Sequence, residues 1–232
     1  MPKKNIPRSK AFTSKMALNC IQLTPDGRQR LNLSFKALDA VPACIQSLCR
    51  VDELILSRNL IVSLPDFMLD FVNIQVLDLH SNYLEQIPPT LGLLKNLIVL
   101  NLCNNRLTQV PKELGLLQNL QVLYLGLNRL HMLPTAIGNL KELLYIGLSD
   151  NKFSSVPKCL AHLQKLQKAN LDRNPFPPPP GEEKVEIPRK FHLAHACDLC
   201  ENCLDNCRTE RRKLVEATQI KEQIQSTWHE MK

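Results

Sequence analysis

Four cysteines near the end of the chain have a spacing that could bind a metal. The C-x2-C-x2-C-x3-C run consists of Cys197, Cys200, Cys203 and Cys207. Thiolates at this spacing hold iron–sulfur clusters, and thiolates combined with imidazoles such as His192 or His195 bind zinc. Arg208 follows the run where a cluster motif usually has proline, and the local composition is helical. We therefore expect these cysteines to pack on a capping helix without a metal or cofactor, and metal or redox chemistry is the alternative.

A second set of reactive residue types lies in the middle of the chain. His80 and Cys103 are 23 residues apart, and Asp78 precedes His80 by two residues. A cysteine with a histidine and a carboxylate can form an activated nucleophile. Because no inserted loop could supply an oxyanion hole or exclude water, we expect no catalysis by these residues and no enzymatic activity.

The separation of 23 residues is also the period of an internal repeat. Proline recurs at positions 42, 65, 88, 111, 134, 157 and 180, and asparagine at 59, 82, 105, 128, 151 and 174. Lys36 takes the asparagine position of the first copy. One apolar column consists of Leu31, Leu54, Leu77, Leu100, Leu123, Ile146 and Ala169. Seven copies without an insertion predict a repeat architecture.

Each copy predicts one coil of a solenoid. The unit reads LxxLxLxxNxLxxLPxxLxxLxx, in which the LxL alternation predicts a short strand with both leucines facing inward. Apolar residues three apart after the proline predict a helical or 3₁₀ turn. A single copy cannot bury its leucines, whereas stacked copies form a continuous aliphatic core. We expect an α/β solenoid with a concave parallel β-sheet and short convex helical turns.

The asparagine column predicts an internal ladder of hydrogen bonds. A side-chain amide both donates and accepts, so it can satisfy backbone groups left open where the strand bends away. Proline is suited to the second bend, where a fixed φ and a missing N–H are tolerated.

The repeat unit resembles the 23-residue class of intracellular leucine-rich repeats, whose motif ends in Leu-Pro. The whole chain also resembles the small proteins related to leucine-rich repeat-containing protein 18. That closer resemblance rests on Asn19-Cys20-Ile21, Asp26-Gly27, Leu79-His80-Ser81-Asn82-Tyr83, Asn174-Pro175-Phe176-Pro177, and Cys200, Cys203 and Cys207 in the tail. The resemblance implies an arc-shaped, horseshoe-like scaffold that binds proteins, and it implies no catalytic residues.

Three segments follow from these patterns. Residues 1–27 form a basic N-terminal arm and cap, residues 28–180 hold the seven repeats, and residues 181–232 form a proline linker and a cysteine-containing helical tail. Within the cap we expect a short helix in residues 11–20 and a turn, in the manner of a hairpin, leading to the first repeat strand.

Charge and composition restrict the partners. Of the formal net charge of +7, residues 1–30 carry +6 and residues 31–180 carry only +2. The repeats therefore lack the basic stripe that nucleic acid requires. No apolar run approaches the roughly 18 residues of a membrane span, and no secretory signal is visible. Nine cysteines without such a signal indicate a reducing compartment, so we expect a cytoplasmic protein. We also expect a monomer that binds neither nucleic acid nor membrane.

Outward positions of the predicted strands form a candidate binding face. Three valines and a tyrosine lie in one column, bounded by Glu53 and Lys168, and such an apolar stripe is a plausible protein-binding site. The candidate partner-binding residues are Val76, Asp78, His80, Val99, Asn101, Cys103, Val122, Tyr124, Tyr145 and Asp150. The alternative is that valine simply suits a strand. We expect a non-catalytic scaffold or adaptor that binds a protein partner and regulates intracellular signalling. A metal- or redox-responsive module is the alternative function.

Overall fold

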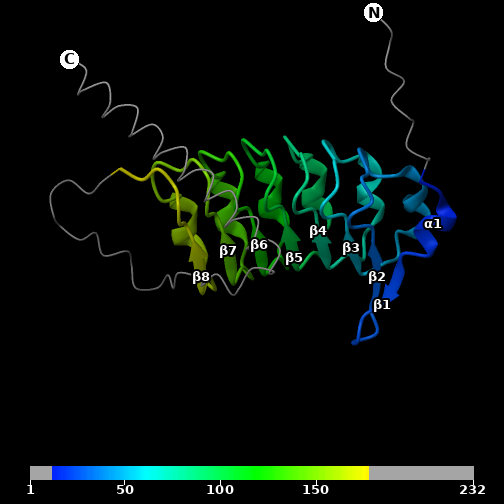
Figure 1. The fold of residues 1–232 in the computed structure, drawn as a ribbon. Helices are drawn as coiled ribbons and strands as arrows, with labels where there is room; N and C mark the ends of the chain where they lie inside the picture. Colours follow the sequence, from blue (N-terminus) through cyan, green and yellow to red (C-terminus); the bar gives the residue numbers. More distant parts are fainter. Residues whose placement is uncertain (1–11, 178–232) are drawn as a thin grey trace, which may run out of the picture. The chain divides into compact units, whose positions relative to one another are not determined.

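The computed structural model describes residues 12–177 of the 232-residue chain. These residues form one α-helix, eight β-strands and six 3₁₀ helices (Figure 1). The strands are β1 (Ile21–Leu23), β2 (Gln29–Asn32), β3 (Glu53–Ile55), β4 (Val76–Asp78), β5 (Val99–Asn101), β6 (Val122–Tyr124), β7 (Tyr145–Gly147) and β8 (Lys168–Asn170). The predicted cysteine tail lies outside the described residues, so its packing stays a prediction.

The strands form a single sheet in sequence order, as the repeat period requires. Strands β2 to β8 are parallel, and β1 pairs with β2 in the antiparallel sense. Each parallel pairing joins residues 23 apart, for example Leu77 with Leu100. The fold class predicted from the sequence, a leucine-rich-repeat solenoid with a parallel sheet and seven repeats, is confirmed.

The core is aliphatic and runs the length of the solenoid. Both leucines of the LxL alternation are fully buried in the central repeats, as are Phe71 and Phe153. The alternation places these side chains on one face of each strand, where they pack against the turns on the other side of the coil. Because each coil buries its leucines only against its neighbours, stability depends on stacking.

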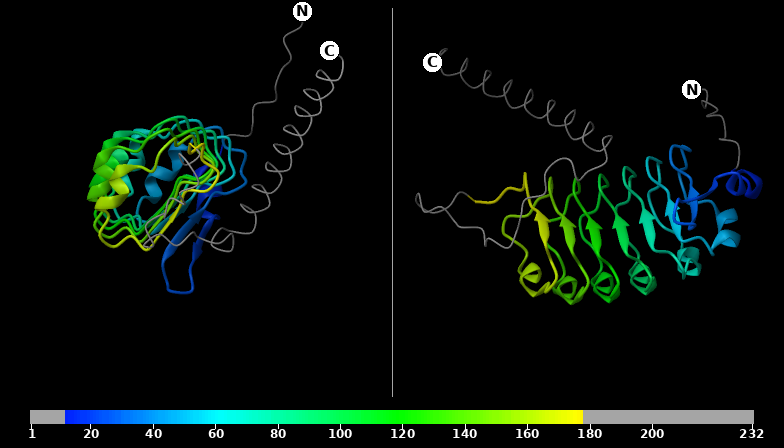
Figure 2. Two further views of the ribbon diagram at one scale, coloured as in Figure 1. Left: turned by 90° about the vertical axis from the view of Figure 1, so that its left-hand side faces the viewer. Right: turned by 90° about the horizontal axis from the view of Figure 1, so that it is seen from below.

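The turn after each proline is a 3₁₀ helix. These helices are η1 (Ala43–Leu48), η2 (Asp66–Asp70), η3 (Pro89–Leu93), η4 (Lys112–Leu116), η5 (Thr135–Asn139) and η6 (Lys158–His162), and a proline is the N-cap of each. They lie on the side of the coil opposite the sheet (Figure 2). Neighbouring helices approach closely at glycines: a Cβ added at Gly115 would lie 2.2 Å from the carbonyl oxygen of Ala136.

The asparagine ladder is present. Asn105 donates through its amide to the carbonyls of Leu79, Leu102 and Cys103 at 3.0 to 3.2 Å, and it accepts from the backbone N–H of Leu84 at 3.0 Å. The equivalent bonds recur at the other asparagines of the column, Asn59, Asn82, Asn128, Asn151 and Asn174. Each asparagine therefore connects its own coil to the preceding one.

The short helix and the hairpin expected ahead of the first repeat are both present. Helix α1 (Ser14–Leu18) begins after Thr13, whose side chain accepts a hydrogen bond from the N–H of Met16. Strand β1 then turns through Gly27, at φ +80°, and returns as β2. No helix within residues 12–177 combines the length and apolar character needed to cross a membrane.

Candidate partner-binding face

The first outward column of the sheet is an apolar stripe of four half-buried side chains. It consists of Val76, Val99, Val122 and Tyr145, which pair in register across β4 to β7. With adjacent strands about 4.8 Å apart, the stripe extends over about 14 Å. Glu53 stands at one end of the column, where Arg30 donates to its carboxylate at 2.6 Å, and Lys168 stands at the other end. The column predicted from the sequence is therefore continuous.

Two tyrosines form an aromatic platform at one end of the stripe: Tyr145, its last member, and Tyr124 of the neighbouring column. The ring centroids of Tyr124 and Tyr145 are 5.1 Å apart, and the ring planes are inclined by 51°. A Cβ added at Gly147 would lie 3.4 Å from the ring and hydroxyl of Tyr145 and 3.5 Å from the ring of Tyr124. Both rings therefore pack against the bare backbone at Gly147.

Gly147 is not among the candidate binding residues predicted from the sequence, although it occupies an outward strand position. Its signal was present, because a glycine inside a strand marks a close approach by another group. Strand alternation predicts that the Tyr145 side chain leaves the outer face of the sheet. The absence of a side chain at Gly147 leaves the space in which the Tyr145 ring packs.

The second outward column runs in register through Ile55, Asp78, Asn101, Tyr124, Gly147 and Asn170. Its three polar amide or carboxylate side chains fasten the ends of the strands. The Asn101 Oδ1 accepts from the N–H of Cys103 at 3.1 Å, and the Asn170 Oδ1 accepts from the N–H of Asp172 at 3.0 Å. Asp78 makes the same bond to the N–H of His80 at 3.1 Å. These bonds hold the side chains in fixed orientations on the face.

The third column is less accessible than strand alternation suggests. His80 and Cys103 are each only 7% exposed, and Ser57 and Ser149 are also buried. Here the strand turns into the next bend, and side chains of adjacent coils pack against one another: a Cβ at Gly126 would lie 3.1 Å from the Ser149 hydroxyl and 3.4 Å from the Cys103 sulfur. His80 and Cys103 therefore contribute more to packing than to the open face.

The histidine of this column is hydrogen-bonded to the carboxylate two residues before it. The His80 Nδ1 lies 2.8 Å from one carboxylate oxygen of Asp78, whereas its Nε2 is buried without a hydrogen-bond partner. Cys103 is therefore not hydrogen-bonded to His80, and the nucleophile–base contact required for a cysteine nucleophile does not form.

The turn after each strand contains a residue in the left-handed region. Arg58, Ser81, Asn104, Leu127, Asp150 and Arg173 have φ between 53° and 56°. Asp150 forms an ion pair with Arg173 in the next coil. Asp150 is therefore a candidate residue at the margin of the face, and Arg173 neutralises its carboxylate.

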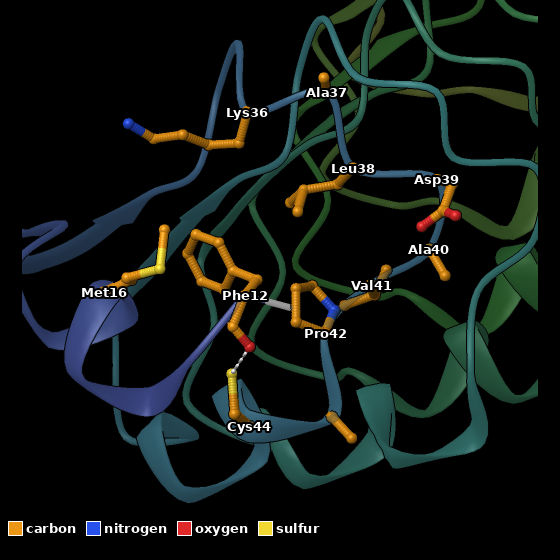
Figure 3. A pocket seen from close by; sticks show the side chains of 11 residues that line it. Phe12, Met16, Lys36, Ala37, Leu38, Asp39, Ala40, Val41, Pro42 and Cys44 are labelled. Atoms are coloured by element: carbon orange, nitrogen blue, oxygen red, sulfur yellow. Dashed lines mark hydrogen bonds between the residues drawn. The ribbon is translucent and has the colours of Figure 1, made fainter. Parts of the chain in front are cut away.

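A separate half-open pocket of about 430 Å³ lies between α1 and the first repeat. Phe12, Met16 and Pro42 contribute apolar walls, and the Cys44 thiol donates to the carbonyl of Phe12 at 3.6 Å (Figure 3). In this atypical first turn both Phe35 and Ala37 are left-handed. The pocket is the seam between the cap and the repeats and lies apart from the apolar stripe.

Among residues 12–177 no three histidine, cysteine or acidic side chains are grouped to hold a metal ion. Burial raises the pKa of the Cys159 thiol on the convex side, which keeps the thiol protonated. The predicted ligands Cys197, Cys200, Cys203 and Cys207 lie outside this range.

Known proteins with the same repeat give an independent comparison. Residues 72–130 and 118–176 match the family model described as leucine rich repeat. The LRR protein LIC12759 of Leptospira interrogans is 34% identical, with a TM-score of 0.57 over 71% of this chain and 47% of its own. The leucine-rich repeat domain of the type III effector XCV3220 (XopL) is 26% identical, with a TM-score of 0.56 over 66% of this chain and 53% of its own.

The internalin InlF of Listeria monocytogenes shares the fold at 21% identity, with a TM-score of 0.54 over 62% of this chain and 40% of its own. The chain spans about half the length of the LIC12759 and XopL chains that it matches. The 23-residue coil, the ladder of asparagines and these matches identify the chain as a leucine-rich-repeat protein.

Proposed function

We propose that this protein is a non-catalytic scaffold or adaptor that binds a protein partner on the concave face of its sheet. The single observation that carries the proposal is the in-register apolar stripe, whose last member, Tyr145, packs against Tyr124 to form the tyrosine platform. The binding residues are Val76, Asp78, Val99, Asn101, Val122, Tyr124 and Tyr145, with Asp150 at the margin and His80 and Cys103 in the packed column.

Electrostatics and packing support apolar contact as the source of affinity. Residues 31–180 carry a net charge of only +2, and the charged pairs at both ends of the face neutralise each other. Tyrosine is enriched at binding hot spots because it combines a rigid apolar ring with a polar hydroxyl. The platform places two such rings together in the middle of the face.

The test is to replace both tyrosines by alanine. Partners are captured from cell extract with the wild-type chain and identified, and each is then titrated against Tyr124→Ala/Tyr145→Ala by calorimetry. We expect binding to weaken by about 2–4 kcal/mol if either tyrosine is a hot spot, with little change in melting temperature.

The matched control lies on the convex side. Lys95 is unsuitable because its amine donates to the carbonyls of Gly92 and Leu116. Lys141 occupies the same repeat position, is exposed, and makes no side-chain hydrogen bond among the described residues. Lys141→Ala should bind like the wild type. The proposal would be wrong if the tyrosine variant bound as tightly as the wild type and deletion of residues 181–232 abolished binding. The tail would then be the partner-binding segment.

We further propose a cytoplasmic, monomeric protein whose partner recognition serves intracellular signalling. The flanking motifs, such as Asn19-Cys20-Ile21, support placing it with the small proteins related to leucine-rich repeat-containing protein 18. Gel filtration with light scattering tests the monomer, and a mass twice that of the chain would contradict it.

A further inference from the structure

Two amide groups on the concave face are oriented as hydrogen-bond donors. Since the oxygens of Asn101 and Asn170 each accept from a backbone N–H, which cannot accept in return, the orientation of both amides is fixed. Their Nδ2 groups donate to no other residue in the described part of the chain. Both side chains are only half-buried. The face therefore presents two pre-oriented donors.

The strong acceptors near these donors are already engaged. The Asp78 carboxylate contacts the His80 ring at 2.8 and 3.0 Å, and the Asp150 carboxylate pairs with Arg173. A ligand that brought N–H groups to the centre of the face would find few acceptors. A ligand that brought carbonyls would find donors.

The donors flank the aromatic platform in one row across the sheet. Pairing in register runs from Asn101 to Tyr124, then to Gly147 and Asn170. At about 4.8 Å per strand, the two asparagines are about 14 Å apart. The Tyr145 ring packs over Gly147 and against the Tyr124 ring, so aromatic side chains occupy the surface between the two donors.

We propose that this row binds a proline-rich segment of the partner in the polyproline II conformation, running across the strands. Such a segment has carbonyl acceptors and almost no N–H donors, its backbone makes no internal hydrogen bonds, and its rings pack on aromatic side chains. The complementarity lies in both properties together, because the row offers donors at its ends and aromatic rings between them. The inference rests on the proposed function and names the chemistry of the partner.

The dimensions fit a short ligand. Polyproline II rises about 3.1 Å per residue, so about five residues span the distance from Asn101 to Asn170. A peptide of about ten residues therefore covers the row with some length to spare.

The probe is a fluorescein-labelled oligoproline of about ten residues, titrated with the full chain and followed by fluorescence polarisation. A labelled glycine–serine peptide of the same length is the control ligand. We expect saturable binding of the oligoproline at least about tenfold tighter than that of the control peptide. Binding should change little with salt, because neither ligand is charged along its length.

The decisive variants are Asn101→Asp and Asn170→Asp. Aspartate at this position keeps the bond to the strand end, as Asp78 does in the adjacent coil, but it removes the donors. Each variant should melt close to the wild type and bind oligoproline about tenfold more weakly. Tyr145→Leu, which removes the platform and leaves the donors, should weaken binding similarly.

Two results would overturn the inference: oligoproline binding no tighter than that of the control peptide, or unchanged affinity in both aspartate variants. The proposed function would survive either result if the captured protein still lost affinity on Tyr124→Ala/Tyr145→Ala. Both proposals fail if oligoproline does not bind and the tyrosine variant keeps its full affinity for the captured partner.

Discussion

Replacing Asn105 by alanine should destabilise the protein because it leaves one buried backbone group without any partner. Asn105 is 8% exposed and holds four backbone groups. Three are carbonyls that keep other donors: Asn82 bonds to Leu79, Asn128 to Leu102, and the N–H of Ser81 to Cys103. The fourth is the N–H of Leu84, whose acceptor within residues 12–177 is the Asn105 oxygen.

The magnitude follows from this difference. An orphaned buried donor costs about 1–3 kcal/mol, and carbonyls that keep one of two partners lose less. We expect a total of about 2–3 kcal/mol, which for a chain of this size lowers the melting temperature by roughly 4–12 °C. Asn105→Asp should be at least as damaging, because it keeps an acceptor for Leu84 but turns a second oxygen toward three carbonyls.

Differential scanning calorimetry on the full chain measures these changes, with Lys36→Ala as the control. Lys36 occupies the same repeat position in the first coil, and its side chain is exposed. Its backbone N–H bonds to Asn59 at 3.0 Å, a contact that alanine keeps. If Asn105→Ala and Lys36→Ala lowered the melting temperature equally, the ladder would not be the source of stability.

Other parts of the fold give further predictions. Gly115→Ala should lower the free energy of unfolding, measured by urea denaturation, by about 1–3 kcal/mol, because its Cβ would overlap the Ala136 carbonyl. The control Gly126→Ala meets only contacts of 3.1 Å or longer and should lose less. Equal losses would contradict the close packing of the 3₁₀ helices. Iodoacetamide should label Cys159 more slowly than Cys44 at neutral pH, because its raised pKa leaves less thiolate, and peptide mapping reading the reverse order would refute this. In the full chain purified under reducing conditions we expect no stoichiometric zinc or iron; about one metal per chain, lost on Cys200→Ser, would establish a metal site in the tail.

The periodic features were predictable because each is repeated. A single asparagine says little, but Asn59 through Asn174 at one period could only be a structural column, and the prolines that cap the 3₁₀ helices follow the same logic. Even the hairpin at Gly27 was visible from its turn residues. In each case a local physical requirement recurs at the same place in the coil.

Contacts between coils could not be predicted in the same way. Alternation placed His80 and Cys103 on the outer face, but packing along the solenoid buries both. Glu53, expected at the end of an exposed stripe, is buried under Arg30. The platform likewise depends on Gly147 lying beside Tyr124 of the preceding strand. Strand period describes one coil, whereas these properties arise from two coils in contact.

The uniform coil length also makes the molecule divisible. Each asparagine accepts from the backbone N–H of the residue 21 positions earlier and donates to a carbonyl 26 positions earlier. Every coil therefore presents the same donors and acceptors to the next coil. Excising residues 83–105 removes one whole unit, and Asn128 would then meet the carbonyl of Leu79 where it now meets that of Leu102. The two flanking coils would then stack directly on each other, and the solenoid would be one strand, or about 4.8 Å, shorter with its hydrogen bonds in register. A cut that is not a multiple of 23 residues would leave the asparagines out of register with their backbone partners. This architecture can therefore change by duplication or loss of whole coils.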